Sequence, residues 1–284
     1  MANTLKRVRS TSISSERGGT VAPPTTVTAQ NNKKRKLPQS SVLQSPFPTL
    51  IHPTIAEARE VYVLLCAAHG TPGPAPPVET PLPNILEGLI STILSQSTSG
   101  SNSSRAKAGL DAAFGRNNFS AIADASQERV VEAIRCGGLA KKKANTIQKV
   151  LSTIHTRHRV YSLQFLASKT DDLRKTDAEV TAELLSYPGV GPKTAACVMS
   201  LCLGREAFAV DTHVWRLSKV LGWVPSTADR VLTQAHLEER LPGDLKLGLH
   251  VLMMRHGRAC MGCKKSDGGA CILNNHRRAR TLPV

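Results

Sequence analysis

The sequence predicts an all-α protein. From Thr54 onward, apolar residues recur at spacings of three and four, and no stretch sustains the alternation of period two that marks a half-buried strand. Several of these runs end at glycine or proline, as helices do. A chain of 284 residues is long enough to bury a substantial core, in one large domain or two modest ones.

The elements follow in order along the chain. A first helix covers 55–69 and ends at Gly70, after which four prolines between positions 72 and 77 force an extended linker. The next run begins near Asn84, and its wide apolar face belongs in a core. Further helices are predicted at 103–114, 127–135, 140–155, 161–168, 178–186, 192–203, 212–221, 227–240 and 244–256.

The charge of the chain favours a polyanionic partner. The formal net charge is +16, and the first 45 residues hold eight Lys or Arg against one Glu, so about +9 belongs to the rest. Those 45 residues are too polar to offset chain entropy, and we expect a disordered tail. Its cluster Lys33-Lys34-Arg35-Lys36 indicates nuclear import, or a nonspecific DNA-binding arm. The basic, Ser-rich start also allows mitochondrial targeting.

Cysteine usage and hydropathy exclude other classes. Seven cysteines are an odd number, and no secretory signal precedes them, so a reducing compartment fits better than a disulfide scaffold. No stretch of about 18 uninterrupted apolar residues occurs, which argues against a membrane span.

The segment YPGVGPKTAACV (187–198) predicts two helices joined by a tight hairpin. The first helix must stop at Tyr187-Pro188, and Pro192 can open the second because a first-turn proline gives up no hydrogen bond. Between them, Gly189-Val190-Gly191 can take positive φ angles, so that backbone N–H groups point outward and bind a phosphate oxygen. Such a clamp fixes position on a duplex and reads no sequence.

Lys193 and Asp211 each have a structural and a chemical interpretation. Lys193 falls in the first turn of the second helix, where the dipole disfavours a cation, so it is either a surface lysine or a residue placed for chemistry. Asp211, in FAVDTHVWRL, follows an apolar stretch and precedes a helical run, which makes it a natural N-cap.

The two motifs together resemble a known family. PGVGPKTA followed by FAVDTHVWRL is similar, in residues and in spacing, to the helix-hairpin-helix (HhH-GPD) DNA glycosylase superfamily, and most of all to its endonuclease III branch. In that family the hairpin lysine is a nucleophile and the aspartate its acidic partner, which implies these catalytic roles for Lys193 and Asp211. Branches that remove bases without cutting the strand carry a residue such as Ser or Tyr in place of the lysine.

The resemblance extends upstream. ILSQSTSGSNSSRA (93–106) resembles the family segment whose Gln enters the gap left in the duplex, so Gln96 is the expected wedge and Ser97 the alternative. A polar helix end packed beside the hairpin is the structural interpretation. CGGLAKKKANTIQKVL (136–151) resembles the segment before another DNA-facing helix. Its lysines 141 to 143 either touch phosphate or are solvated, and Lys142 is our DNA-binding candidate. His213 is a phosphate neighbour, or a packed or capping histidine.

The resemblance implies an architecture and an activity. Residues 82–205 would form a six-helix barrel module, and 50–81 with 206–284 a second lobe, with double-stranded DNA in the cleft between them. The implied function is a monomeric base excision repair glycosylase with AP lyase activity, acting at a damaged base or abasic site through a lysine Schiff base. A glycosylase without lyase chemistry and a noncatalytic DNA-binding module are the alternatives. Oxidised pyrimidines are the family default; mismatched uracil or thymine and 5-methylcytosine stay open.

The C-terminal cysteines depart from the branch's [4Fe–4S] motif, C-x6-C-x2-C-x5-C. Cys260, Cys263 and Cys271 follow C-x2-C-x7-C, three thiolates where a cubane normally uses four. We therefore predict no cluster and no other cofactor. Completion of a zinc site by His256 or His276 is the less favoured alternative. The favoured one is a loop whose basic residues approach DNA: Lys264, Lys265, Arg277, Arg278 and Arg280.

Overall fold

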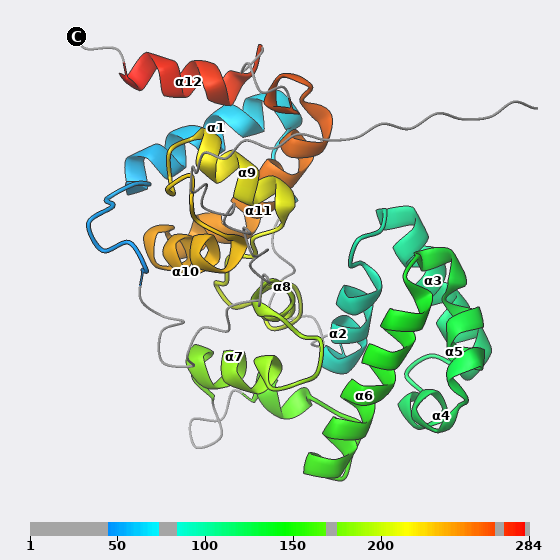
Figure 1. The fold of residues 1–284 in the computed structure, drawn as a ribbon. Helices are drawn as coiled ribbons and strands as arrows, with labels where there is room; N and C mark the ends of the chain where they lie inside the picture. The colour runs from blue at the N-terminus through cyan, green and yellow to red at the C-terminus, as the bar shows by residue number, and fades with distance from the viewer. Residues whose placement is uncertain (1–44, 74–83, 169–174, 265–269, 282–284) are drawn as a thin grey trace, which may run out of the picture. The chain divides into compact units, whose positions relative to one another are not determined.

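The structure, a computed structural model, describes residues 45–73, 84–168, 175–264 and 270–281. The predicted tail up to residue 44 lies outside these ranges, which belong to one compact unit, Leu37–Val284. Figure 1 shows the α-helices α1 (Ile55–His69), α2 (Ile85–Leu94), α3 (Gly100–Phe114), α4 (Phe119–Asp124), α5 (Gln127–Ala133), α6 (Ala140–His158), α7 (Asp177–Leu185), α8 (Pro192–Cys202), α9 (Thr212–Val220), α10 (Arg230–Arg240), α11 (Gly243–Ala259) and α12 (Ile272–Thr281). No strand occurs in the described ranges, so the all-α prediction is confirmed.

Side-chain caps fix where many helices begin. The Thr54 hydroxyl accepts a hydrogen bond from the Glu57 N–H, and the Glu57 carboxylate accepts one from the Thr54 N–H. Thr176 and Glu179 form the same capping box. Asp229 caps α10 through one oxygen. These polar residues satisfy N–H groups that have no partner within the helix. The predicted starts agree with the structure for α1 and, within one residue, for α7, whereas α10 begins three residues later than predicted.

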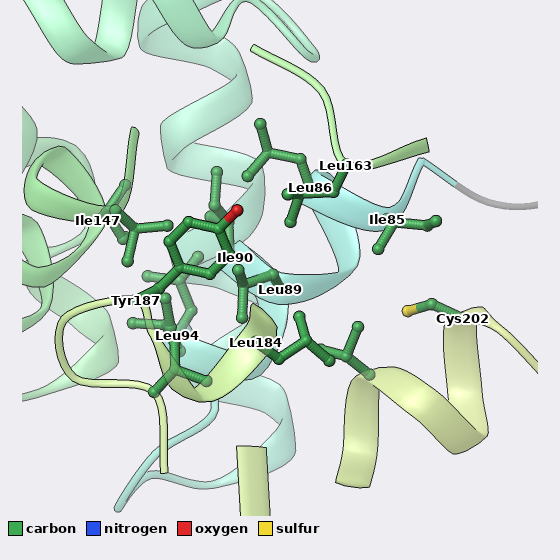
Figure 2. Close-up of a cluster of buried hydrophobic side chains, with 14 of the residues drawn as sticks. Ile85, Leu86, Leu89, Ile90, Leu94, Ile147, Leu163, Leu184, Tyr187 and Cys202 are labelled. Atoms are coloured by element: carbon green, nitrogen blue, oxygen red, sulfur yellow. The ribbon is translucent and has the colours of Figure 1, made fainter. Parts of the chain in front are cut away.

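A first hydrophobic core is built from α2 to α8. Helix α2 lies at its centre, with six fully buried aliphatic side chains, and Figure 2 shows Tyr187 among the aliphatic residues of this cluster. Helices α2 and α8 approach closely at Gly88, where an added Cβ would lie 2.3 Å from the Cys202 Sγ. A side chain at position 88 would require the Cys202 side chain to move.

A second core joins both ends of the described chain. It combines α1 with residues from Phe208 to Leu273, so helices α1, α9 and α11 pack together. We propose that the chain has the two lobes that the sequence predicts. The separation of the buried side chains into two clusters supports this proposal. No helix in the described ranges is both long enough and apolar enough to span a bilayer.

Three segments differ from the sequence prediction. The predicted helix at 161–168 is only a short 3₁₀ turn, η3 (Gln164–Ala167), followed by residues outside the described ranges. Helix α4 was not predicted because its six residues are too few to show a helical period. Helix α12 was interpreted as a loop because its sequence, ILNNHRRART, is dominated by polar and basic residues. That interpretation is wrong for residues 272–281.

Candidate active site

The α7–α8 hairpin forms where the sequence predicts it. The Val190 N–H donates to the Tyr187 carbonyl at 3.2 Å and its side chain is buried, while Gly189 is exposed. Gly189 has a φ of +77°, and an added Cβ would lie 2.7 Å from Thr146 Cγ2, so both conformation and space demand glycine. The expectation of positive φ at both glycines is wrong for Gly191, which is extended at −108°.

The first turn of α8 keeps backbone donors free of side-chain caps. Pro192 occupies its first position, and Gly191, the N-cap residue, contributes no side-chain hydrogen bond. The backbone N–H groups of Lys193 and Thr194 therefore lie at an uncapped helix start, where the helix dipole favours an anion. This is the backbone geometry that a phosphate clamp requires.

Asp211 caps helix α9 with only one of its two carboxylate oxygens. Its Oδ1 accepts hydrogen bonds from the backbone N–H groups of His213 at 2.9 Å and Val214 at 2.8 Å, which starts α9. Both cap bonds end on the same oxygen, so the cap does not use Oδ2. The structural and chemical interpretations of this residue are thus compatible, because one carboxylate serves both.

Lys193 and Asp211 share two neighbours. Burial raises the pKa of the Cys197 thiol; the Lys193 cation, one helical turn away on α8, opposes that rise, and the Asp211 carboxylate adds to it. Both charged groups also act on His250 of α11. The amine and the carboxylate come from different helices, are half-buried, and lie within electrostatic range of the same thiol and the same imidazole.

His250 is a site residue that the sequence analysis missed. Its Nδ1 lies 2.7 Å from the Ala209 carbonyl, two residues before Asp211. Burial lowers the pKa of His250, with a smaller opposing effect from that carbonyl and from Asp211. A neutral ring that donates through Nδ1 keeps a lone pair on Nε2. No linear motif marks this histidine, which sits on α11 far along the chain.

The predicted wedge segment lies beside the start of α8. Gln96 Nε2 donates to Thr194 Oγ1 at 3.3 Å, immediately next to Lys193. Ser97, the alternative wedge, is exposed and adopts the left-handed conformation at a φ of 51°. The structure therefore places Gln96 beside the predicted hairpin. In the chain without DNA, Gln96 is a polar residue packed at the end of a helix, as the structural interpretation predicted.

The three lysines at the start of α6 differ in environment. Lys141 and Lys142 are exposed, as DNA-contacting or solvated residues would be. Lys143 is neither: it is 3% exposed, and its Nζ donates to the carbonyls of Leu94 at 2.6 Å and Gly137 at 2.8 Å. Burial lowers the pKa of Lys143. Lys143 therefore links the end of α2 to the turn before α6. The expectation that Lys143 contacts phosphate or solvent is wrong.

His213 packs against the end of α11. A Cβ added at Gly257 would lie 2.7 Å from the His213 Cβ, so glycine is needed for this close approach. The packed interpretation of His213 is therefore supported, and its ring is still half-exposed. The contact joins the first turn of α9, which Asp211 begins, to the C-terminal turn of α11.

The C-terminal cysteines converge with one of the two candidate histidines. His256 Nε2 lies 3.1 Å from Cys263 Sγ and 3.5 Å from Cys271 Sγ, and these sulfurs are 3.0 Å apart. With Cys260, all four donor atoms lie within 4.8 Å of one another. His276 instead lies 3.8 Å from Glu60 Oε2. The prediction of no metal or cofactor is not supported, because these residues form a potential ligand set.

Comparison with known proteins identifies the family of the chain. A family model described as HhH-GPD superfamily base excision DNA repair protein matches residues 90–243. A putative DNA glycosylase of Arabidopsis thaliana is 36% identical over 248 residues, which cover 78% of this chain and 82% of that protein. Endonuclease III of Thermotoga maritima is 31% identical over 188 residues, 66% of this chain and 80% of the relative.

Solved structures with a similar fold include endonuclease III. The structure of endonuclease III trapped as a covalent intermediate with DNA has a TM-score of 0.59 at 25% identity, and the similarity covers 80% of this chain and 99% of that one. The all-α scaffold with its helix-hairpin-helix, together with these matches, places the chain in the class of DNA glycosylases that act in base excision repair. The chain belongs to the HhH-GPD superfamily, and its predicted resemblance to endonuclease III is confirmed.

Proposed function

We propose that this glycosylase is bifunctional: it removes a damaged base and then cuts the strand through a Schiff base on Lys193. One observation carries the proposal. The Lys193 amine and the Asp211 carboxylate both act electrostatically on the Cys197 thiol and the His250 imidazole, and the helix cap leaves Asp211 Oδ2 unused. A noncatalytic DNA-binding hairpin requires no such acid.

The chemistry follows from these two groups. The Lys193 ammonium first gives a proton to water, and the resulting amine forms a bond from Nζ to the sugar C1′ as the C1′–N bond breaks. The base leaves with the electron pair of that bond and gains a proton. The ionised Asp211 stabilises the positive charge that develops on the sugar. Opening of the sugar ring gives an imine, loss of a C2′ proton expels the 3′ phosphate by β-elimination, and water then releases the lysine.

We propose that double-stranded DNA with a damaged base or an abasic site is the substrate, bound by one copy of the chain. The target nucleotide must leave the duplex to reach Lys193. The uncapped N–H groups after Gly191 would hold a phosphate, and Gln96 would fill the gap once it releases Thr194. The trapped complex of endonuclease III with DNA is a precedent for a covalent intermediate on this fold.

Borohydride trapping on a duplex with one abasic site tests the lyase step. Wild type is expected to form a covalent adduct and a nicked strand, and Lys193→Gln to form neither. Lys149→Gln, which changes an exposed lysine on α6, is the control and should trap DNA normally. Base release from a lesion duplex without any adduct would favour a glycosylase that lacks lyase chemistry.

A panel of duplexes with single lesions identifies the base. We propose oxidised pyrimidines first, with mismatched uracil or thymine and 5-methylcytosine as the further candidates. Release of each base is measured under single-turnover conditions with wild type and Lys193→Gln, so that contaminating activity is excluded. A substrate of this site loses its release in the variant.

We propose nuclear localisation for this protein, with a mitochondrial location as the alternative. The basic cluster at 33–36 supports import, and it lies outside the described residues. A fluorescent fusion of the full chain should concentrate in the nucleus and become diffuse when the four basic residues are replaced by alanine. Colocalisation with mitochondria in both forms would reverse this proposal.

A further inference from the structure

The cluster of His256, Cys260, Cys263 and Cys271 is unused by the mechanism above. Its four side chains come from the end of α11, the 3₁₀ turn η5 (Gly262–Lys264) and the residue before α12. His256, Cys263 and Cys271 are buried, and Cys260 is half-buried. Three thiols and one imidazole whose donor atoms all lie within 4.8 Å of one another match the ligand set of a tetrahedral zinc site.

The spacing of the donors fits a single ion. Around one tetrahedral Zn²⁺ with Zn–S bonds of 2.3 Å, sulfur atoms lie ~3.8 Å apart. The donor atoms here have separations of 3.0, 3.1 and 3.5 Å, and none exceeds 4.8 Å. Modest movements of the side chains would bring all four to ideal distances.

A [4Fe–4S] cubane does not fit the same residues. Each terminal ligand of a cubane binds a different iron atom, so its four ligands surround the whole cluster and are spread much more widely than around one ion. The cubane also normally takes four thiolates, and this group offers three. The donor atoms of this chain lie too close together, and include too few thiolates, to hold the [4Fe–4S] cluster that the resemblance to endonuclease III implies.

The histidine of the group is oriented by a second histidine. His256 Nδ1 lies 2.8 Å from Nε2 of His69, the last residue of α1. A proton on His256 Nδ1 that is donated to His69 leaves the lone pair of Nε2 directed at the two sulfurs. Metal-binding histidines ordinarily have such a partner on the other ring nitrogen, and the partner fixes their tautomer.

The surrounding chain holds the loop and balances its charge. Arg216 of α9 donates to the carbonyls of Cys263 and, at 3.2 Å, Gly257. The Cys260 N–H donates to the His256 carbonyl at 2.8 Å. Zn²⁺ with three thiolates and a neutral imidazole has a net charge of −1, and the guanidinium of Arg216, hydrogen-bonded to the Cys263 carbonyl, is a nearby positive charge. Arg216 can therefore balance the charge of the proposed zinc site.

We propose that His256, Cys260, Cys263 and Cys271 bind one Zn²⁺, in the region where the family's endonuclease III branch commonly carries an iron–sulfur cluster. The ion joins α11 to the start of α12, and through His69 and Arg216 it joins both to α1 and α9. Because Gly257 packs on His213, the ion also stabilises the turn that Asp211 begins. Its role is structural, and the proposal stands whatever chemistry Lys193 performs.

Metal analysis of the full-length protein tests the proposal directly. The chain is expressed with iron and zinc both supplied and purified without oxygen, so that a labile cluster would survive. We expect one zinc per chain, with iron and acid-labile sulfide below a tenth of that amount. Four irons with four sulfides would overturn the proposal. So would metal-free protein that fails to take up added zinc, or protein with a Cys263–Cys271 disulfide.

Variants separate specific binding from chance binding to thiols. Cys263→Ser should lose the zinc, whereas Cys136→Ser, which changes a half-buried cysteine of the other core, should keep one zinc per chain. His69→Phe leaves all four ligands in place and should weaken zinc retention against a competing chelator by about 10- to 100-fold. Equal zinc content in Cys263→Ser and wild type would contradict the assignment of ligands.

Discussion

At the residue scale, Asp211 performs two tasks that substitution can separate. Asparagine can still accept the cap bonds on its oxygen but has no charge, whereas alanine loses both. Asp211→Asn should therefore lower the single-turnover rate of base release about 100-fold or more, with little change in the free energy of unfolding. Asp211→Ala should lower the rate similarly and also destabilise the protein by about 1 kcal/mol.

The two measurements are base release from a lesion duplex and the free energy of unfolding in urea. An Asp211→Asn variant with the wild-type rate would show that the carboxylate acts only as a cap. Asp229, which caps α10 in the same way through one oxygen, provides the control. Asp229→Asn should leave the rate unchanged.

Lys142 and Lys143 are neighbours in sequence with different environments. Lys143→Met would leave the carbonyls of Leu94 and Gly137 without their buried donor, so it should destabilise the fold by about 1–3 kcal/mol. Lys142→Met, at an exposed position, should change stability by less than about 0.5 kcal/mol. If Lys142 contacts phosphate, its loss should also reduce the salt slope of DNA binding by about one.

Urea unfolding of the two variants, with DNA affinity measured at several salt concentrations, checks both statements. Equal stability of the two variants would show that the buried hydrogen bonds of Lys143 contribute nothing. A salt slope unchanged by Lys142→Met would remove that residue from the DNA interface.

At the scale of elements, the two glycines of the hairpin have different reasons for being glycine. Gly189→Ala would place a side chain at positive φ and against Thr146, and should destabilise the protein by about 1–2 kcal/mol. Gly191→Ala meets open space at an ordinary φ and should leave stability nearly unchanged.

Thermal and urea unfolding of the two alanine variants measure this difference. A Gly191→Ala variant that is stable yet binds DNA weakly would indicate that the phosphate approaches the backbone closely at that residue. Two equally stable variants would show that the α7–α8 turn tolerates a Cβ at position 189, against the geometry.

The sequence located the elements well where the signal is local. The helix starts at Thr54, Asn84, Thr176 and Asp211 depend on a side chain that bonds to backbone two or three residues away, so a short window contains the information. The hairpin depends on glycine and proline, which act through their own dihedral angles. Helix α4 was missed because its six residues are too few to show a period, and α12 was missed because its sequence is mostly polar and basic.

The parts of the site that were not predicted depend on long-range packing. Lys143 gains its role from the end of α2, and His250 from the Ala209 carbonyl just before Asp211, both far away in the sequence. The metal ligands have a nonstandard spacing, and the orientation of His256 is set by His69, 187 positions earlier. Tertiary structure alone brings these groups together.

At the scale of the whole molecule, His236 connects the N-terminal described segment to α10. Its Nε2 lies 2.6 Å from the His52 carbonyl and its Nδ1 2.6 Å from Ser45 Oγ, and the side chain is fully buried. Burial lowers the pKa of His236 below its ordinary value. The folded protein therefore favours the neutral ring, and the unfolded chain binds a proton more readily.

The sign of the pH effect follows from that difference. The stability due to neutral His236 is fully present above the unfolded pKa near 6.5 and is lost as the pH falls toward the lower folded pKa, by at most about 1.4 kcal/mol per pH unit. Urea unfolding of wild type between pH 7.5 and 5, compared with His236→Gln, should show the steeper loss in wild type. Parallel curves would contradict this role of the histidine.

The most direct test of the central claim is to map the covalent bond to DNA. Wild-type protein is trapped with borohydride on an abasic duplex and digested, and the cross-linked peptide is sequenced by mass spectrometry. The proposed mechanism predicts one modified residue, Lys193, carrying the reduced sugar remnant. A remnant on any other amine, with Lys193 unmodified, would contradict it.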